Sequence, residues 1–159
     1  MDSQQGDIDE QGQLDRSPLP DMYGQAGHWV RRAHQVHNSL WTTLVSAAVT
    51  PSQFSTLSAL ADHPNIDQNA ISRATSLDTS TIGAIVNRLI QRGWIEVSKD
   101  PSDLRRNLLT LSPAGEDEFR LIAQKAARMT DVFVQPLAGP EQRELVRILK
   151  LLVEAGEQR

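Results

Sequence analysis

Two groups of polar side chains near the middle of the chain are suited to bind an anionic polymer. The first group is the hydroxyl-bearing run Thr79–Thr81, which directly follows Asp78. The second is the stretch DPSDLRRN at residues 100–107, in which two adjacent arginines follow the turn-forming pairs Asp-Pro and Ser-Asp. Hydroxyl and guanidinium groups bind phosphate oxygens and the edges of bases, so both groups indicate a nucleic-acid partner.

The hydroxyl run begins the second of two short helices that the sequence predicts. Asp67 is suited to cap a helix that starts at Gln68, and Asp78 to cap another that ends at Gly93. Apolar residues recur at helical spacing in both segments. The residues expected to be buried are Ala70, Ile71, Ala74, Ile82, Ile85, Val86 and Leu89. Two short helices joined by a tight turn form a helix-turn-helix, whose second helix enters the major groove of DNA by its N-terminal half.

The arginine stretch lies between two predicted strands, Trp94–Lys99 and Asn107–Leu111, which together form a β-hairpin. An arginine at the tip of such a hairpin fits the narrow minor groove of DNA, where the negative potential is concentrated. We expect the carboxylate of Asp103 to hold the guanidinium group of Arg105 in a fixed pose. Without a helix-turn-helix before it, the same pair would be an ordinary surface ion pair.

Further helices are predicted over residues 25–48, 51–63, 113–133 and 141–155. Thr50-Pro51 and Ser112-Pro113 each place a hydroxyl N-cap before a proline at the first helical position. The chain is therefore mainly α-helical with a small β-hairpin. The last two helices carry apolar residues that suit either a dimer interface or the core of the chain itself: Phe133, Val134, Leu145, Ile148, Leu149 and Leu152.

Composition argues against several other classes of protein. The 159 residues include no cysteine, which rules out disulfides and thiolate metal sites, and no apolar run long enough to span a bilayer. No secretory signal is recognisable, so we expect a cytoplasmic protein with one folded domain and no membrane partner. Residues 1–21 hold six acidic residues and one basic residue, so this segment alone carries a larger negative charge than the net −4 of the whole chain. We expect it to form a disordered acidic arm.

Three local motifs and the order of the helices carry a family resemblance. The motifs are LDTSTIGAIVNRLIQRGWIE at residues 77–96, Asp103-Leu104-Arg105, and LTLSPAG at residues 109–115. They are similar to the recognition helix, the Asp-x-Arg signature of the hairpin or "wing", and the exit from the wing in the MarR family of winged helix-turn-helix transcriptional regulators. The likeness covers about residues 22–155. Leu104 departs from the family pattern, because many members have an arginine at that place.

The resemblance implies a homodimer that binds a double-stranded, pseudo-palindromic DNA operator. It implies a MarR-type domain over residues 22–159, with a DNA-binding lobe at 50–112 and dimerisation helices at 22–49 and 113–156. The residues expected to contact DNA are Arg73, Thr79, Ser80, Thr81, Gly83, Asn87, Arg88, Asp103, Arg105 and Arg106.

The segment GHWVRRAHQ, residues 27–35, resembles a branch of the family that governs the breakdown of aromatic acids, including nicotinate and hydroxycinnamate pathways. The resemblance implies a repressor released by a small-molecule effector, either an aromatic carboxylate or its CoA thioester. Arginine pairs with carboxylate or phosphate, and tryptophan stacks on an aromatic ring. The candidate effector contacts are His28, Trp29, Arg31, Arg32, His37 and Trp41.

An enzyme is the first alternative to a DNA-binding protein. The chain has no glycine-rich phosphate loop, no Gly-x-Ser-x-Gly elbow and no cysteine nucleophile, so we expect no catalytic residues. His34 and His37 are three residues apart on one helix, but no carboxylate stands at a matching spacing, so we expect no metal and no cofactor. The second alternative is a winged-helix module that serves dimerisation or protein interaction without small-molecule control.

Overall fold

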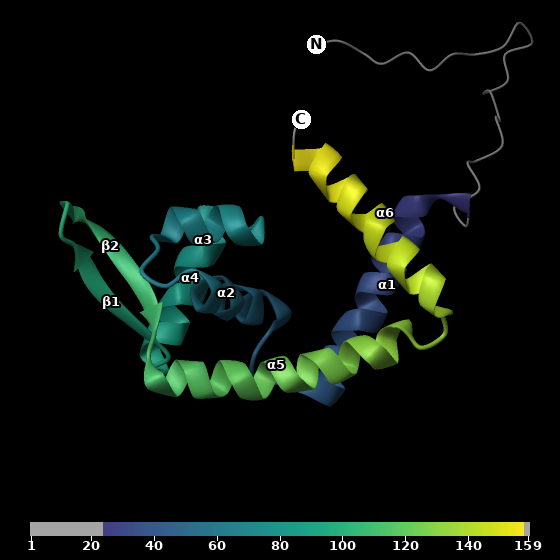
Figure 1. Ribbon diagram of the computed structural model, residues 1–159, viewed down its shortest axis with the longest axis horizontal. Helices are drawn as coiled ribbons and strands as arrows, with labels where there is room; N and C mark the ends of the chain where they lie inside the picture. Colours follow the sequence, from purple (N-terminus) through teal and green to yellow (C-terminus); the bar gives the residue numbers. More distant parts are fainter. Residues whose placement is uncertain (1–23, 158–159) are drawn as a thin grey trace, which may run out of the picture. The chain divides into compact units, whose positions relative to one another are not determined.

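The computed structural model describes residues 24–157, so the acidic arm predicted at residues 1–21 lies outside the described part of the chain. The helices are α1 (Ala26–Leu40), the π-helical turn η2 (Trp41–Val45), α2 (Pro51–Asp62), α3 (Gln68–Thr75), α4 (Thr79–Gln91), α5 (Pro113–Val134) and α6 (Gly139–Glu157). The strands β1 (Ile95–Asp100) and β2 (Asp103–Leu111) form an antiparallel hairpin (Figure 1). The predicted fold class, mainly α with a small hairpin, is confirmed.

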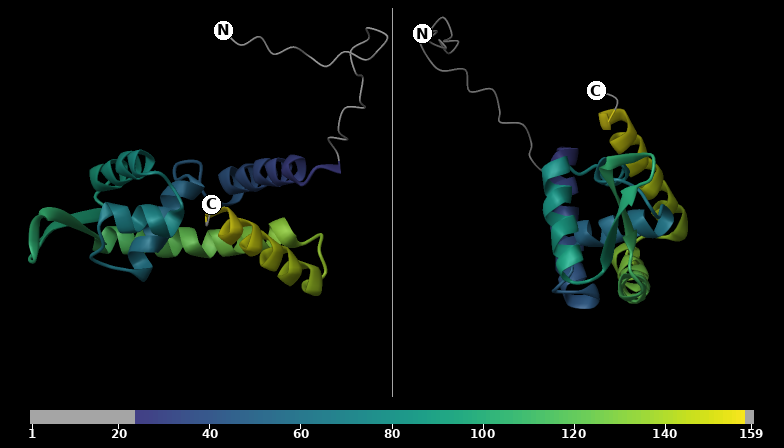
Figure 2. Two further views of the ribbon diagram at one scale, coloured as in Figure 1. Left: turned by 90° about the horizontal axis from the view of Figure 1, so that it is seen from above. Right: turned by 90° about the vertical axis from the view of Figure 1, so that its left-hand side faces the viewer.

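The chain divides into two compact units, residues 1–35 and residues 36–159. Of the first unit, the structure describes the N-terminal part of α1, which has no buried side chain. In the second unit the hairpin projects beyond α3 and α4, and α5 leaves the base of the hairpin (Figures 1 and 2). No helix between residues 24 and 157 has the length and apolar character needed to cross a membrane.

Each predicted helix cap is present. The side chains of Asp67, Asp78 and Ser112 accept the backbone N–H groups of Ala70, Thr81 and Gly115, the third residue after each cap. Thr50 forms a full capping box with Gln53, in which each side chain accepts the backbone N–H of the other residue. These caps fix where α2 to α5 begin, which is why the sequence placed those helix starts correctly.

Several boundaries and burial assignments differ from prediction. The first helix does not reach Ala48, because the hydroxyl of Ser46 accepts the N–H groups of Ala48 and Val49 and turns the chain before Pro51. The second strand begins at Asp103 rather than Asn107, since the turn uses only residues 101 and 102. Ala74, predicted to be buried, is exposed on α3, where Ile71 is the buried residue.

Two hydrophobic cores share one tryptophan. The first core joins α2, α3, α4 and the hairpin, and includes Leu57, Ile71 and Leu89 at 0 % exposure. The second surrounds Trp41, Ile122 and Met129, from η2 and α5. The half-buried ring of Trp94 packs against both cores. Trp94, which follows α4, therefore links the helix pair α3 and α4 to the long helix α5.

The backbone on either side of Trp94 is held against the start of α5. The hydroxyl of Ser112 donates to the carbonyl oxygen of Gly93 at 2.6 Å, and its N–H donates to the carbonyl oxygen of Trp94 at 3.0 Å. Gly115 lies so close that a Cβ at this position would overlap the carbonyl group of Trp94. The glycine at the exit of the wing is thus required by the close approach of two backbones.

We expect Gly115→Ala to destabilise the protein by about 1–3 kcal/mol, because the added methyl group must push α5 away from Trp94. Urea unfolding at one fixed protein concentration would measure this. Gly156→Ala is the matched control: nothing lies within 4 Å of its added Cβ on α6, so stability should stay the same or rise slightly. Equal stability of the two variants would contradict the packing argument.

Candidate nucleic-acid interface

The first turn of α4 presents hydroxyl groups around an ionised cap. The carboxylate of Asp78 accepts the backbone N–H of Thr81 at 2.8 Å, the hydroxyl of Ser80 at 2.9 Å and the hydroxyl of Thr81 at 2.5 Å. The hydroxyl of Thr81 is the main cause of a pKa lowered to about 2 for Asp78. Thr79 and Ser80 are exposed and Thr81 is half-buried. This turn can therefore offer several oxygen atoms to a partner at neutral pH.

The exposed face of α4 continues through Ala84, Asn87 and Arg88. Ile82, Ile85, Val86 and Leu89 are buried on the opposite face, as predicted. On the preceding helix, Arg73 is exposed in the last turn of α3. A solvent-facing row of polar and small residues on the second helix is what entry into a groove requires.

Gly83 has a role inside the helix-turn-helix that the sequence did not indicate. A Cβ at this position would lie 3.1 Å from Nε2 of Gln68, which donates to the carbonyl oxygen of Thr79 at 3.0 Å. The glycine therefore makes room for a side chain that joins α3 to the start of α4. A contact between Gly83 and DNA stays a prediction.

The tip of the hairpin is shaped by two aspartates. Asp100 accepts the N–H and the hydroxyl of Ser102, at 2.8 Å and 2.6 Å, which closes the turn. Asp103 accepts the backbone N–H of Arg105 at 3.0 Å. The expectation that Asp103 holds the guanidinium group is wrong, because its carboxylate instead holds the backbone of the arginine. Arg105 is exposed, and within residues 24–157 its guanidinium makes no ion pair.

Arg106 ties the hairpin to the helix-turn-helix. Its guanidinium lies 2.6 Å from the carboxylate of Asp67, the cap of α3, and 3.3 Å from that of Asp100. A backbone bond runs beside it, since the N–H of Leu109 donates to the carbonyl oxygen of Ile66 at 2.9 Å. Arg106 therefore has two carboxylate partners within the protein, and a contact with DNA stays a prediction.

The charges of this cluster support one another. The bond from the N–H of Ala70, followed by that from Arg106, lowers the pKa of Asp67 below 3.8. The bonds from Ser102, followed by the charge of Arg106, lower the pKa of Asp100. The bond to Asp67 raises the pKa of Arg106. All three groups stay charged at neutral pH, so the tie between hairpin and α3 is ionic there.

A second arginine, Arg92, joins the end of α4 to the segment before α2. Its guanidinium donates to the carbonyl oxygen of Ala48 at 2.9 Å and lies 4.9 Å from the ring centroid of Trp94. The two residues joined by the hydrogen bond are 44 positions apart. No spacing rule in the sequence signals such a pair, and sequence reasoning missed it.

The candidate effector residues all lie on α1 and at the start of η2. In the first unit, Trp29 is 54 % exposed and the guanidinium of Arg31 lies 3.5 Å from Nδ1 of His28. Arg32 is exposed on the same helix. In the second unit, the half-buried ring of His37 stands edge-on to Phe133 at 5.7 Å. Direct contact of these residues with a ligand stays a prediction.

Trp41, which the sequence offered as a stacking partner for an effector, is a core residue. It is 4 % exposed, and its indole N–H donates to the carbonyl oxygen of Val49 at 2.6 Å. Its ring packs against His37 at 6.4 Å and Phe54 at 5.4 Å. The ring therefore supports the shape of η2, and its aromatic faces already have partners.

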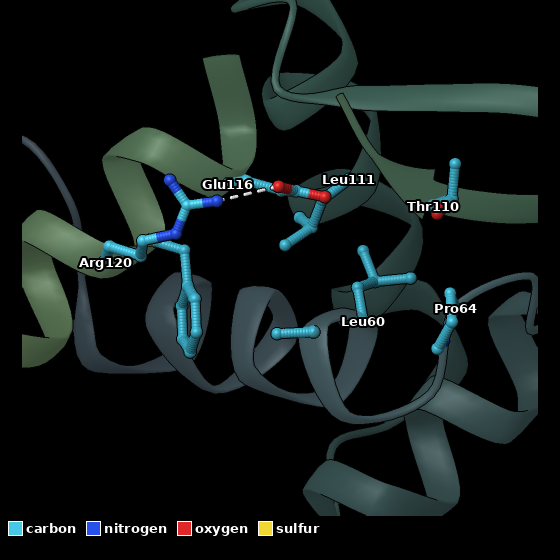
Figure 3. A pocket seen from close by; sticks show the side chains of 8 residues that line it. Leu60, Pro64, Thr110, Leu111, Glu116 and Arg120 are labelled. Carbon is cyan, nitrogen blue, oxygen red and sulfur yellow. Dashed lines mark hydrogen bonds and ion pairs between the residues drawn. The ribbon is translucent and has the colours of Figure 1, made fainter. Parts of the chain in front are cut away.

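A pocket of about 260 Å³ lies between α2, β2 and the first turns of α5 (Figure 3). Leu60, Pro64 and Leu111 form its apolar wall, and Arg120 stands at its edge. The guanidinium of Arg120 is paired with Glu116 at 2.9 Å and Asp117 at 2.6 Å. The guanidinium of Arg120 already has carboxylate partners, so it is not available to pair with an anionic ligand in this pocket.

Most apolar residues of α6 are exposed. Ile148 and Leu149 are each 42 % exposed, Leu152 is 58 % exposed, and α6 has no buried residue. Phe133, Val134 and Leu145 are half-buried. The alternative that this stripe fills the core of its own chain therefore does not hold for α6.

Between residues 24 and 157, no group of three or more His, Asp or Glu residues is placed to hold a metal ion.

Comparison with known proteins identifies the family. The MarR family model matches residues 49–106. The transcriptional repressor NicR of Pseudomonas putida is 30 % identical over 145 residues, which cover 91 % of either chain. The chain belongs to the MarR family. Membership makes it a DNA-binding transcriptional regulator and not an enzyme.

Two solved structures of MarR-type regulators are similar over most of the chain. The PcaV regulator of Streptomyces coelicolor, in complex with its natural ligand, superposes with a TM-score of 0.82 at 38 % identity and covers 86 % of this chain and 96 % of PcaV. BpsR of Bordetella bronchiseptica, whose DNA binding is regulated by 6-hydroxynicotinic acid, superposes with a TM-score of 0.79 at 30 % identity, over 82 % and 94 % of the two chains.

We expect Asp67→Asn to weaken the attachment of the wing while keeping the cap of α3, because asparagine caps helices as well as aspartate does. The N–H of Ala70 and then the guanidinium of Arg106 hold the pKa of Asp67 below its ordinary 3.8, so the ionised carboxylate stabilises the fold above that pH, and its contribution is lost as the pH falls through the folded value. The unfolding free energy of the variant should be lower than that of wild type at pH 7, and the two values should converge below pH 3.8.

Hydrogen exchange of the Leu109 amide gives a second measure, because this N–H donates across the same junction to Ile66. Its protection should fall in Asp67→Asn and at least as far in Arg106→Gln, which also loses the pair with Asp100, and the double variant should match Arg106→Gln. Asp131→Asn, an exposed carboxylate on α5, is the control. A difference in unfolding free energy between wild type and Asp67→Asn that does not change with pH would rule out the ionic tie.

Proposed function

We propose that this MarR-family protein represses aromatic-acid catabolic genes in the cytoplasm. It binds a pseudo-palindromic operator as a homodimer and leaves it when an aromatic acid or its CoA thioester binds. The observation that carries the proposal is the contrast between two adjacent arginines. Arg106 is committed to Asp67 and Asp100, whereas Arg105 is exposed without an ion pair among the described residues. A guanidinium left free on a projecting hairpin is suited to the minor groove.

The first turn of α4 supplies the contacts to the major groove in this proposal. Hydroxyl and amide groups of the exposed face reach base edges, while arginines at its margin pair with phosphates. Asp103 acts indirectly, because it fixes the backbone from which Arg105 extends. The residues assigned to DNA contact are Arg73, Thr79, Ser80, Thr81, Asn87, Arg88 and Arg105, with Gly83, Asp103 and Arg106 supporting them.

A dimer is required because one recognition helix reads too few base pairs for useful specificity. The exposed apolar stripe of α6 supplies a surface for it: the side chains of Ile148, Leu149 and Leu152 are 42 to 58 % exposed in the single chain. Burying them against a second copy removes this apolar area from water. We assign residues 50–112 to the DNA-binding lobe, and residues 22–49 and 113–156 to dimerisation.

The effector class is proposed from the relatives. NicR is a transcriptional repressor, PcaV was crystallised with a natural ligand, and 6-hydroxynicotinic acid, which regulates BpsR, is an aromatic carboxylate. In this chain, Arg31 and Arg32 supply cations for a carboxylate, and His28, Trp29 and His37 supply rings and hydrogen bonds. The ligand acts by favouring a dimer whose recognition helices no longer match the groove.

The alternative is a winged-helix module that serves dimerisation or protein interaction, without small-molecule control. It predicts a dimer whose affinity for DNA is indifferent to every aromatic acid. The proposal and the alternative therefore differ in one titration, in which ligand is added to a preformed complex of protein and DNA.

We expect Arg105→Ala to lower the affinity for the operator and to reduce the salt slope by about one, because one phosphate-neutralising cation is lost. Fluorescence anisotropy with DNA from upstream of the protein's own gene, at several salt concentrations, would measure both. Lys125→Ala, an exposed cation on α5, is the control and should change neither quantity. An Arg105→Ala variant with wild-type affinity at every salt concentration would refute the role of Arg105.

We expect at least one aromatic carboxylate or CoA thioester to release the protein from that DNA. Arg31→Ala should then raise the ligand concentration for half release by about tenfold or more, since a charge-assisted hydrogen bond contributes about 1.5–3 kcal/mol. Arg32→Ala, its neighbour on α1, shows which of the two arginines pairs with the ligand. If no compound of a panel that includes 6-hydroxynicotinic acid releases the DNA, the alternative without ligand control is favoured.

A further inference from the structure

The hydroxyl hydrogens at the start of the recognition helix are already used within the protein. The hydroxyl of Ser80 donates to Oδ1 of Asp78 at 2.9 Å, and the hydroxyl of Thr81 donates to Oδ2 at 2.5 Å. A hydroxyl has one hydrogen and two lone pairs, and an ionised carboxylate only accepts hydrogen bonds. Each hydroxyl therefore donates its only hydrogen to Asp78, and its oxygen can still accept a hydrogen bond from a partner.

The carboxylate stays ionised wherever DNA binding is measured. Three hydrogen bonds converge on it, and they place its pKa at about 2. The direction of the two hydroxyl bonds is thus the same from mildly acidic to alkaline pH. The backbone N–H of Thr81 holds Oδ1 at 2.8 Å, so the carboxylate cannot turn away while α4 is capped.

We propose that Asp78 sets the base preference of this protein by making Ser80 and Thr81 hydrogen-bond acceptors only. In the major groove, such oxygens pair with the exocyclic amino groups of adenine and cytosine. They do not pair with the N7 and O6 acceptors of guanine or the O4 of thymine. The inference rests on the proposed function, in which this turn of α4 enters the major groove.

The same arrangement turns the hydroxyls away from phosphate contacts. A phosphate oxygen needs a donor, and the nearby carboxylate also repels its negative charge. The hydroxyls are therefore assigned to bases, and the backbone contacts fall to arginines such as Arg73 and Arg88, which are exposed. Asp78 is a positioning residue in this scheme, because it acts on DNA through Ser80 and Thr81.

The substitution Asp78→Asn should change the hydrogen bonding of one hydroxyl and leave that of the other unchanged. The amide oxygen must stay at the Oδ1 position, where it accepts the N–H of Thr81 and the hydroxyl of Ser80. The amide nitrogen then occupies the Oδ2 position and donates to the hydroxyl oxygen of Thr81. The hydrogen of Thr81 is set free, so this residue changes from acceptor to donor while Ser80 is unchanged.

The test measures the affinity of full-length wild type, Asp78→Asn, Ser80→Ala and Thr81→Val for an operator and all its single base-pair substitutions. Wild type should prefer adenine or cytosine at the positions read by the two hydroxyls, by about 2- to 10-fold per contact. Ser80→Ala and Thr81→Val should each flatten the preference at one position, which assigns that position to its residue.

At the position assigned to Thr81, Asp78→Asn should turn the preference toward guanine or thymine, and the position of Ser80 should keep its preference. Asp131→Asn is the control: it makes the same carboxylate-to-amide change at an exposed position on α5 and should leave the order of base preferences unaltered. Asp78→Ser keeps a capping oxygen for Thr81 but frees one or both hydroxyl hydrogens, so it should broaden the preference even if Asp78→Asn folds poorly.

Specific binding by Asp78→Asn with the wild-type order of preferences would overturn the inference and leave the proposed function intact. So would a wild type that prefers guanine or thymine at the positions of Ser80 and Thr81. Absence of any sequence-specific DNA binding by wild type would overturn both proposals.

Discussion

The close approach between α5 and the backbone around Trp94 holds together the end of α4, the base of the hairpin and the start of α5. Ser112 donates to the carbonyl oxygens of Gly93 and Trp94, and Gly115 leaves no space for a side chain against the second of these. The ring of Trp94 packs into both hydrophobic cores. The end of α4, the base of the wing and the start of α5 therefore meet at one junction, which couples the orientation of the wing to that of α4.

Around this junction, neighbouring charges have separate tasks. Arg106 binds Asp67 and Asp100 and so anchors the wing to α3, while Arg92 reaches the carbonyl oxygen of Ala48 and anchors the end of α4. Arg105 has no such partner in the described chain. These internal ion pairs and hydrogen bonds leave the guanidinium of Arg105 available for the DNA contact proposed above, and a wing held in place before binding would lose less entropy on DNA. Two adjacent arginines thus have different surroundings: Arg106 binds carboxylates of the protein, and Arg105 is exposed to solvent.

Local chemistry explains what could be predicted. The starts of α2 to α5 followed from capping residues, and the buried face of α4 from the spacing of Ile82, Ile85 and Leu89, because both depend on neighbours within a few positions. Contacts across the fold could not be read in this way. The pairs Arg106–Asp67 and Arg92–Ala48 join residues 39 and 44 positions apart, and the burial of Trp41 depends on Val49 and Phe54 folding back over it.

The sequence by itself determined the helices, the hairpin and the family, because helix caps, apolar periodicity and the Asp-x-Arg wing motif are written in consecutive residues. Only the tertiary structure decided which polar groups are free to act. It committed Arg106 to carboxylates, placed Trp41 in a core, aimed Asp103 at a backbone N–H and gave the hydrogens of Ser80 and Thr81 to Asp78. The physical reason is that hydrogen-bond donors are few on each side chain, and only the folded arrangement shows which have already been used.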